Sequence, residues 1–315
     1  MNKEPDLELS VLVPLFDEEE NLRPLFAKIE EVLSGLGITW EAIFVDDGST
    51  DGSFEVLRDL RTLEPRIRVF RLRRNFGKSA ALDTGFKAVR GRRVIIMDAD
   101  LQDDPAEIPV LLKKIDEGYD LVTGWRADRH DRLVKKYTSR LYNLVTSTLT
   151  GIRLHDFNCG LKAFRREVIE NISLYGELHR YIPPLAHWKG YRVTEIRVRH
   201  HRRAFGKSKF GAYRFFAGFM DLLTVMFMTR YSKKPLHLFG GAGLILFLAG
   251  LVINGYLVML NLLGKDFLRV RPLMFLGVLL MLVGFQLLST GLLAELMTMS
   301  IHRKKEERVV REVLE

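Results

Sequence analysis

Two uncharged apolar runs near the C-terminus constrain the fold of this chain more than any other feature. Residues 236–264 and residues 273–294 contain no Asp, Glu, Lys or Arg over 29 and 22 positions. About 20 apolar helical residues cross the hydrocarbon core of a bilayer, and buried core helices of soluble proteins rarely reach such lengths without a charge. The short connection between the runs, residues 265–271, predicts a helical hairpin that spans a membrane twice. A plain soluble enzyme is therefore excluded.

Basic residues surround the two runs and predict the orientation of the hairpin. Three basic residues lie in the connection, whereas eight flank the outer ends: Arg230, Lys233, Lys234, Arg303, Lys304, Lys305, Arg308 and Arg311. Because Lys and Arg favour the cytoplasmic side, both termini are expected in the cytoplasm, with the chain in a cell inner membrane or an ER-type membrane. The net charge of +9 is concentrated beside apolar segments, which favours an anionic membrane surface over nucleic acid as its partner.

A shorter apolar stretch precedes the hairpin. Residues 215–228 carry Asp221 as their only charge and are too few to cross a bilayer. With basic residues on both sides, this stretch is expected to lie along the inner leaflet, and a core helix of the polar domain is the alternative. We therefore expect a cytoplasmic α/β domain at 1–208, interfacial amphipathic helices at 209–234, two transmembrane helices at 235–298 and a basic cytoplasmic tail at 299–315.

The polar part of the chain alternates strand-like and helix-like segments. Runs rich in Val, Ile and Phe lie at residues 9–16, 41–47, 68–72 and 92–98. Amphipathic stretches with apolar residues at helical spacing lie between them, at residues 18–33, 53–63 and 78–89. This alternation predicts a Rossmann-like, mostly parallel sheet covered by helices on both faces. Ligands of such sheets bind beyond the carboxyl ends of the strands, and polar clusters follow three of these runs.

The sharpest polar cluster is the pair Asp98 and Asp100, which directly follows the run Val94–Met97. Residues i and i+2 of an extended chain point the same way, so the two carboxylates can meet one cation. Gln102 can add an amide oxygen. Such hard oxygen ligands suit Mg²⁺ or Mn²⁺, which usually also binds phosphate oxygens. A solvated acidic loop is the alternative interpretation.

Several common enzyme motifs are absent from the sequence. It contains no G-x-G-x-x-G dinucleotide fingerprint, no Walker A loop and no Cys/His spacing typical of zinc sites. A hydride-transfer enzyme and a P-loop NTPase are therefore unsupported.

Four motifs in order resemble one enzyme family. The runs VPLFDEEEN, FVDDGSTDGS, NFGKSAALDTGF and MDADLQDDP are similar to those of the family 2 glycosyltransferases, which have the GT-A fold. The later runs VTGWR and HHRRAFGKSKF, followed by a membrane hairpin, resemble the polyprenyl-phosphate branch of that family. Dolichol-phosphate mannose synthases and bactoprenol glucosyltransferases belong to this branch. The resemblance covers residues 8–300.

The resemblance implies roles for individual residues. The base and ribose of the nucleotide would be held by Pro14, Phe16, Glu18, Val45 and Asp47. The metal and the donor diphosphate would be held by Asp98, Ala99, Asp100 and Gln102. The acceptor phosphate would meet Arg126, Arg140 and Arg203, and catalysis would rest on Asp100, Arg126, Arg203 and Lys209.

Three further positions bear on the resemblance to the family. Asp17 stands where the family usually has Asn, and Trp125 stands where it has a small residue. Asp156 lies where the family often has an Asp near the acceptor, so a catalytic role is one interpretation of it.

By resemblance, the chain transfers a hexose from a UDP- or GDP-linked donor to a polyprenyl phosphate, with inversion and with Mg²⁺ or Mn²⁺ as cofactor. Transfer to another membrane lipid is the alternative, and a homo-oligomer is possible. A processive polysaccharide synthase would need a Q-x-x-R-W element, but the sequence contains no Arg-Trp pair. A transporter would place ionisable groups within its spans, but these spans contain no Asp, Glu, Lys or Arg. A catalytically inactive tether would be expected to lose the D-x-D pair or the Arg cluster, and both are intact.

Overall fold

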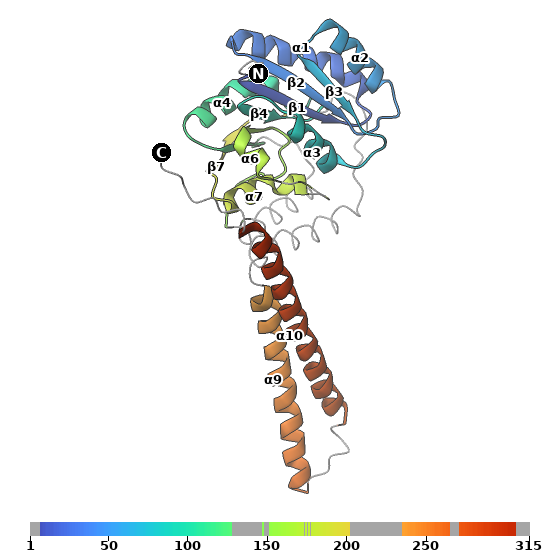
Figure 1. The fold of residues 1–315 in the computed structure, drawn as a ribbon, viewed down its shortest axis with the longest axis vertical. Helices are drawn as coiled ribbons and strands as arrows, with labels where there is room; N and C mark the ends of the chain where they lie inside the picture. Colours follow the sequence, from blue (N-terminus) through green and yellow to red (C-terminus); the bar gives the residue numbers. More distant parts are fainter. Residues whose placement is uncertain are drawn as a thin grey trace. The chain divides into compact units, whose positions relative to one another are not determined.

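The structure is a computed structural model that describes residues 7–127, 147, 151–172, 174, 176, 178–201, 235–264 and 271–306. The chain divides into two compact units, Met1–Val225 and Met226–Glu315 (Figure 1). The predicted interfacial segment 209–234 lies outside the described residues, so it and the domain boundaries around it stay predictions.

The first unit is built on a seven-stranded sheet with the strand order β3-β2-β1-β4-β6-β5-β7. The strands are β1 Leu9–Leu15, β2 Trp40–Asp46, β3 Ile67–Arg71, β4 Arg93–Ile96, β5 Leu121–Trp125, β6 Lys162–Arg165 and β7 Val193–Arg197. Every pairing is parallel except those of β6, which runs antiparallel to both β4 and β5. The prediction of a mostly parallel sheet is confirmed, and the antiparallel strand is an addition that the alternating pattern did not reveal.

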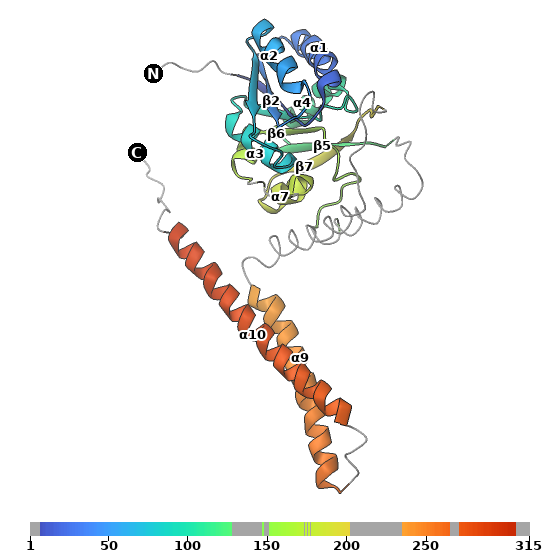
Figure 2. The same ribbon diagram turned by 90° about the vertical axis from the view of Figure 1, so that its right-hand side faces the viewer.

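Helices cover both faces of this sheet (Figure 2). One face carries α1 (Glu19–Leu36), α2 (Ser53–Leu63) and α4 (Ile108–Asp116). The other carries α3 (Lys78–Ala88), α6 (Arg166–Glu170) and α7 (Ile182–Trp188), and two short 3₁₀ helices, η1 (Pro105–Glu107) and η2 (Leu178–Tyr181), precede α4 and α7.

The alternation of side chains along β1 explains why both faces are covered. Val11 and Val13 pack into the core cluster beneath α1 and α4. Leu12 points to the opposite face, where its methyl groups lie against Gly85 of α3. Because both faces of β1 are fully buried, the strand reads as a continuous apolar run and not as an alternating one.

The pairing brings the carboxyl ends of six strands to one edge of the sheet. The last residues of these strands are Leu15, Asp46, Arg71, Ile96, Trp125 and Arg197. β6 runs the other way and begins at the same edge with Lys162. The polar loops that follow the parallel strands, and the loop that precedes β6, therefore meet there.

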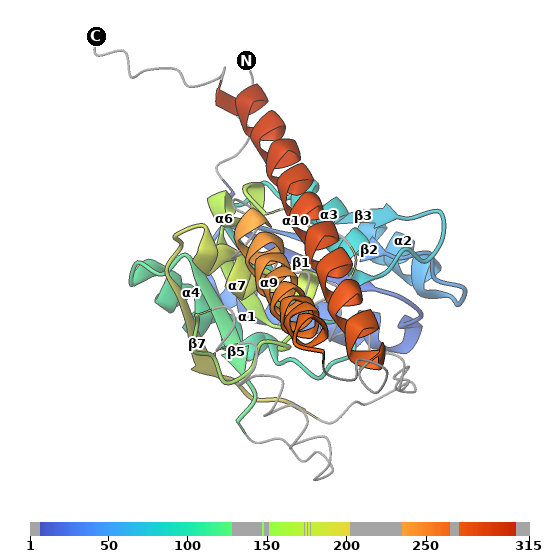
Figure 3. The same cartoon turned by 90° about the horizontal axis from the view of Figure 1, so that it is seen from below.

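The second unit consists of two long helices that pack side by side (Figure 3). They are α9, Pro235–Leu262, and α10, Arg271–Glu306. Only 17% and 11% of their most apolar windows are buried, so most of their apolar side chains face outward. Core helices of a soluble protein would be mostly buried. Both helices are long and apolar enough to cross a membrane, in agreement with the predicted hairpin.

Glycines form the seam between α9 and α10. A Cβ atom at Gly243 would lie 2.6 Å from the carbonyl oxygen of Gly284, and one at Gly284 would lie 2.6 Å from the carbonyl oxygen of Gly243. Gly250 similarly abuts Gly277. These glycines recur every seven residues, the period of helices that supercoil around one another. The close approach of the two helix backbones therefore requires glycine at Gly243, Gly250 and Gly284.

A carboxylate caps the start of α9. Glu295 of α10 accepts a hydrogen bond from the backbone N–H of Leu236 at 3.2 Å. The first N–H groups of a helix have no partner within the helix, and its N-terminus carries partial positive charge. Glu295 thus satisfies one of these groups and joins the open ends of the hairpin.

Candidate active site

The loop after β4 carries the predicted metal ligands. Asp98 and Asp100 are both partly exposed, and Asp98 forms an ion pair with Lys78 at the start of α3. Burial raises the pKa of Asp98, but the charges of Lys78, Lys162 and Arg126 outweigh burial and hold the pKa below its usual value. Asp98 is therefore a carboxylate at neutral pH, surrounded by cationic groups.

Hydrogen bonds within this loop fix its turn. The backbone N–H of Gln102 donates to Asp100 Oδ1 at 3.1 Å, and Leu101 between them adopts a left-handed conformation with φ of 59°. The side-chain amide nitrogen of Gln102 donates to the carbonyl oxygen of His201 at 3.3 Å. The loop thus presents Asp98, Asp100 and Gln102 as oxygen-bearing side chains close together in the chain.

These residues fit a divalent cation shared with a phosphate ligand. Among the residues that the structure describes, no group of three or more His, Cys, Asp or Glu side chains forms a metal cage. Mg²⁺ typically binds through one or two carboxylates together with substrate phosphates, and the hard oxygens of Asp98, Asp100 and Gln102 provide that donor set. Asp103 Oδ2 lies buried nearby without a hydrogen-bond partner in the described parts of the chain. A cation at Asp98 would offset the repulsion between the carboxylates of Asp98 and Asp103.

Gly160 makes room for the two acidic side chains. A Cβ atom there would lie 2.6 Å from Asp98 Oδ2 and 2.8 Å from Asp103 Oδ2. The neighbouring Lys162, only 4% exposed, donates to the carbonyl oxygen of Cys159, and burial lowers the pKa of its ammonium group. Sequence reasoning missed Lys162, because a lysine in the strand-like run LKAF is typical of a solvated face.

Arg126, which directly follows β5, forms a bidentate ion pair with Asp156. Arg126 Nε lies 2.7 Å from Asp156 Oδ2, and Arg126 Nη2 lies 3.1 Å from Asp156 Oδ1. The exposed fractions of the two side chains are 14% and 4%. Burial lowers the pKa of Arg126, but the bonds to Asp156 outweigh burial and raise it. The guanidinium of Arg126 therefore stays protonated and is held in a fixed orientation, although Asp156 balances its charge. The N–H groups that do not face Asp156 have the planar geometry suited to binding phosphate.

Trp125 owes its place to aromatic stacking. Its ring stacks on the imidazole of His155, with ring centroids 4.1 Å apart and an interplanar angle of 17°. The guanidinium of Arg197 lies 4.8 Å from the Trp125 ring centroid, and Glu195 pairs with His155. Trp125 thus has partners on β7 and on the loop before β6. Each member of the stack directly precedes one member of the ion pair, since Trp125 is followed by Arg126 and His155 by Asp156.

The acidic pair after β2 organises neighbouring loops. Asp47 accepts hydrogen bonds from the backbone N–H groups of Phe76 and Gly77, each at 2.8 Å. Burial raises the pKa of Asp47 despite these bonds. Asp46 accepts from the backbone N–H of Ser49 at 2.8 Å. Asp47 therefore fixes the start of α3, from which Lys78 reaches Asp98, and its predicted contact with a nucleotide stays a prediction.

The loop after β1 adapts to Asp17. This residue has a φ of 51°, in the left-handed region that Asn and Asp tolerate best among non-glycine residues. Its carboxylate accepts from the backbone N–H of Thr50 at 2.8 Å. The loop after β1 is thereby tied to the loop after β2, and the acceptor oxygen used is one that Asn also provides.

The other residues that the resemblance predicts to bind the nucleotide lie beside this loop. Pro14 and Val45 are paired in adjacent strands and buried, whereas Phe16 is partly exposed. Glu18 is also partly exposed and accepts from the side chain of Asn21 at 2.6 Å.

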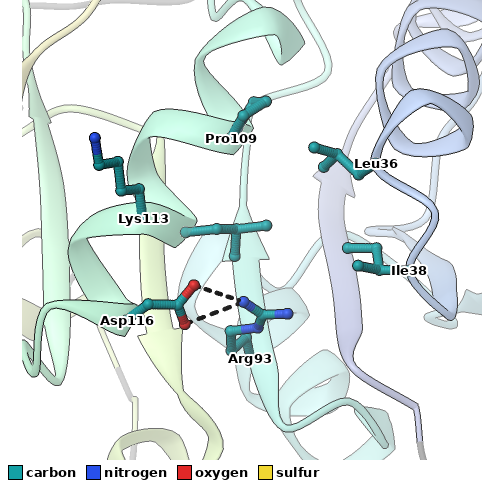
Figure 4. A pocket seen from close by; sticks show the side chains of 7 residues that line it. Leu36, Ile38, Arg93, Pro109, Lys113 and Asp116 are labelled. Atoms are coloured by element: carbon teal, nitrogen blue, oxygen red, sulfur yellow. Dashed lines mark hydrogen bonds and ion pairs between the residues drawn. The ribbon is translucent and has the colours of Figure 1, made fainter.

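The structure thus places the described candidate residues along the carboxyl edge of the sheet. Arg140, Arg203 and Lys209 lie outside the described residues, so their roles stay predictions. A hollow of about 210 Å³ lies elsewhere, at the amino end of β4, beside the ion pair between Arg93 and Asp116 (Figure 4). It is lined by Leu36, Ile38, Arg93, Pro109, Leu112, Lys113 and Asp116. It therefore contains none of the candidate residues.

The sequence of the chain is similar to those of known proteins. Residues 10–173 match the family described as Glycosyl transferase family 2. The chain is 39% identical over 306 residues to the dodecaprenyl-phosphate galacturonate synthase of Rhizobium johnstonii, covering 94% of this chain and 89% of that protein. It is 36% identical over 295 residues to the undecaprenyl-phosphate 4-deoxy-4-formamido-L-arabinose transferase of Salmonella paratyphi B, covering 92% and 88%.

A solved structure shares the fold. The mannosyltransferase of Pyrobaculum calidifontis, solved in complex with GDP-Man and Mn²⁺, aligns with a TM-score of 0.51 at 19% identity. The alignment covers 92% of this chain and 74% of that one. At this identity the likeness concerns the fold alone.

Proposed function

The chain belongs to glycosyl transferase family 2, and on this premise we propose that it transfers a hexose from a nucleotide sugar to a polyprenyl phosphate. The observation that carries the proposal is the similarity to two relatives over more than nine-tenths of the chain. Both relatives are named for a polyprenyl-phosphate acceptor. The alignments extend past the catalytic unit and into the apolar helices, the part of the chain suited to a lipid acceptor.

The chemistry of the acceptor explains what the site must provide. A phosphate monoester has a second pKa of about 6, so a polyprenyl phosphate is mostly dianionic at neutral pH. A nucleophile that already carries charge needs no strong general base. The protein must instead hold the acceptor oxygen in line with the anomeric carbon of the donor, which direct displacement with inversion requires. Arg126 is suited to this task because Asp156 fixes the plane of its guanidinium.

The donor side must stabilise a departing nucleoside diphosphate. Asp98, Asp100 and Gln102 would hold Mg²⁺ or Mn²⁺ there, and the bound cation would supply Lewis-acid stabilisation of the diphosphate oxygens. Lys78 and Lys162 balance the acidic loop, since both lie close enough to Asp98 to lower its pKa. Pro14, Phe16, Glu18, Val45 and Asp47 would form the base and ribose end of the cleft, as the family resemblance implies.

The hairpin would anchor this chemistry at a membrane. We propose that α9 and α10 cross a cell inner membrane or an ER-type membrane, with the catalytic unit and both termini in the cytoplasm. The basic stretch that contains Arg203 and Lys209, together with Arg140, would meet the acceptor phosphate near the membrane surface. A homo-oligomer stays a further expectation.

A direct assay tests the proposal. Membranes that contain the chain are incubated with polyprenyl phosphate and, in turn, with radiolabelled UDP- and GDP-sugars, and lipids are then extracted. We expect one sugar to enter the lipid phase only when both polyprenyl phosphate and the chain are present. Label that enters a different lipid without added polyprenyl phosphate would support the alternative acceptor. Label that never enters a lipid would overturn the proposal.

A further inference from the structure

The segment that follows β7 lies against the predicted metal loop. His200 and Asp103 form an isolated antiparallel bridge, and the backbone N–H of His201 donates to the carbonyl oxygen of Gln102 at 2.8 Å. Residues 199–201, which we call the β7 clasp, are thereby joined to a loop about 100 residues earlier in the chain. A clasp of only three residues gains little from its own burial, because Arg199 and His201 are exposed.

Side chains reinforce this backbone contact at both ends of the clasp. His201 Nε2 lies 3.1 Å from Asp104 Oδ2, and Arg199 Nε lies 3.2 Å from Glu107 Oε1. The backbone N–H of Arg199 also donates to Glu107 Oε1 at 3.3 Å. Asp104 and Glu107 belong to the turn that leads into α4, so the clasp holds the loop against a rigid element.

The contact determines how the side chain of Gln102 is turned. Its amide nitrogen donates to the carbonyl oxygen of His201 at 3.3 Å. The amide group is planar, with nitrogen and oxygen on opposite sides, so the side-chain oxygen is directed away from His201. The oxygen is the only atom of this amide that can bind a cation. Without the carbonyl of His201, the amide could turn over and present N–H groups instead.

We propose that the β7 clasp positions the metal-binding oxygen of Gln102, and that Arg199 and His201 are positioning residues for the metal loop. The proposal deepens the proposed function, since it rests on a divalent cation at Asp98, Asp100 and Gln102. Neither positioning residue needs to touch the donor, the acceptor or the cation. The clasp acts through the loop, as outer partners of metal ligands do in other metal sites.

Metal affinity is the quantity that the clasp should change. Substitution of such outer partners typically costs about 10- to 100-fold in metal affinity. Removal of the His201 side chain breaks the pair with Asp104 but keeps the backbone bonds to Gln102. We therefore expect the lower end of this range, about a tenfold weaker affinity. Saturating metal should restore turnover, because the reacting groups themselves are unchanged.

The test titrates Mn²⁺ into the full-length chain in detergent, with UDP or GDP present, and measures free Mn²⁺ by electron paramagnetic resonance. His201→Ala should raise the Mn²⁺ Kd about tenfold. His201→Gln, which keeps a donor that can reach Asp104, should stay within about twofold of the unchanged chain. His187→Ala is the matched control, since His187 is an exposed histidine on α7. It should leave the Kd unchanged.

The outcomes are separable from the proposed function, because the titration needs no acceptor and no transfer. In the transfer assay, the KM for Mn²⁺ should rise in His201→Ala while kcat at saturating Mn²⁺ stays within about twofold. An unchanged Mn²⁺ Kd in His201→Ala would overturn the clasp, as would a loss of kcat that excess Mn²⁺ does not restore. If His201→Ala does not fold, Arg199→Gln takes its place with the same expected shift and the same refuting result.

Discussion

The ion pair between Arg126 and Asp156 yields the sharpest stability prediction. Asp156→Asn removes the carboxylate charge while nearly preserving the shape of the side chain, which leaves the guanidinium of Arg126 buried without its counter-charge. Breaking a buried pair in this way costs about 3–5 kcal/mol. We expect the lower end, about 3 kcal/mol, because Asn keeps one oxygen for one of the two bonds. The 14% exposed fraction of Arg126 also lets water reach part of its charge.

Urea unfolding followed by tryptophan fluorescence measures this loss. All three tryptophans, Trp40, Trp125 and Trp188, lie in the first unit, so their emission reports on the domain that contains the pair. With an m-value of about 2 kcal/mol/M, a loss of 3 kcal/mol lowers the midpoint by about 1.5 M urea. Glu170→Gln is the matched control, because it neutralises one partner of an exposed ion pair. In this pair the side chain of Arg166 is 46% exposed and that of Glu170 is 55% exposed. Its midpoint should move by less than about 0.3 M.

A second substitution separates the orphaned charge from lost packing. Arg126→Met in the Asp156→Asn background removes the uncompensated guanidinium and keeps an apolar side chain of similar length. The double variant should be more stable than Asp156→Asn by at least about 1 kcal/mol. If Asp156→Asn unfolds within about 0.3 M urea of the unchanged chain, the pair carries no buried charge of consequence. Asp156 would then not hold Arg126 in the site as proposed.

Four further expectations concern other parts of the chain. Asp100→Asn should fold normally and lower the rate of sugar transfer by about a hundredfold or more. EDTA added to the unchanged chain should cause a similar loss of activity, and added Mn²⁺ or Mg²⁺ should reverse it. Full activity in EDTA would contradict the metal's role. Gly284→Val should lower the melting temperature of the detergent-solubilised protein by several degrees. Gly255→Val should not, because an added Cβ there would meet nothing within 4 Å apart from its own stretch of helix backbone. Equal effects of the two substitutions would argue against the glycine seam. Burial raises the pKa of Cys159 from 9.0 to about 12, so the thiol loses its proton at lower pH in the unfolded state than in the folded state. Cys159 should therefore make the free energy of unfolding fall as pH rises from about 9 to 12. Cys159→Ala should flatten this fall, and an unchanged dependence of the free energy of unfolding on pH would refute the prediction. A reporter fused after Glu315 should be active only in the cytoplasm, and activity on the far side of the membrane would reverse the proposed orientation.

Local sequence patterns were enough to predict the strands β1 to β4 and the helices α1 to α3, whereas they did not predict β5, β6 or β7. The run Val94–Met97 followed by Asp98 and Asp100 marks a buried strand and the polar loop after it, since both signals lie within seven consecutive residues. The two apolar runs predicted the helices of the hairpin for the same reason. The helix α10 nevertheless continues to Glu306, well past residue 294 where the uncharged run ends, because the intervening residues include no Gly or Pro to end it.

Contacts between distant residues could not be predicted in the same way. The bonds from Asp47 to Phe76 and Gly77 join residues about 30 positions apart, and those between the β7 clasp and the metal loop join residues about 100 apart. Nothing local in the sequence reveals that β6 enters between β4 and β5, which is what buries Lys162 beside the acidic loop. These pairings depend on the order of strands in the sheet, and that order follows from packing across the whole unit.

The proposed reaction joins a sugar to the phosphate of a polyprenyl phosphate. Phosphorus NMR of the lipid extract can follow this phosphate, after purified protein has been incubated with polyprenyl phosphate and the nucleotide sugar that labels lipid. We expect the phosphate monoester signal of the lipid to be replaced by that of a phosphodiester, in step with release of nucleoside diphosphate. Release of nucleoside diphosphate while the monoester signal persists would refute the proposed reaction, because the sugar would then have gone to water or to another acceptor.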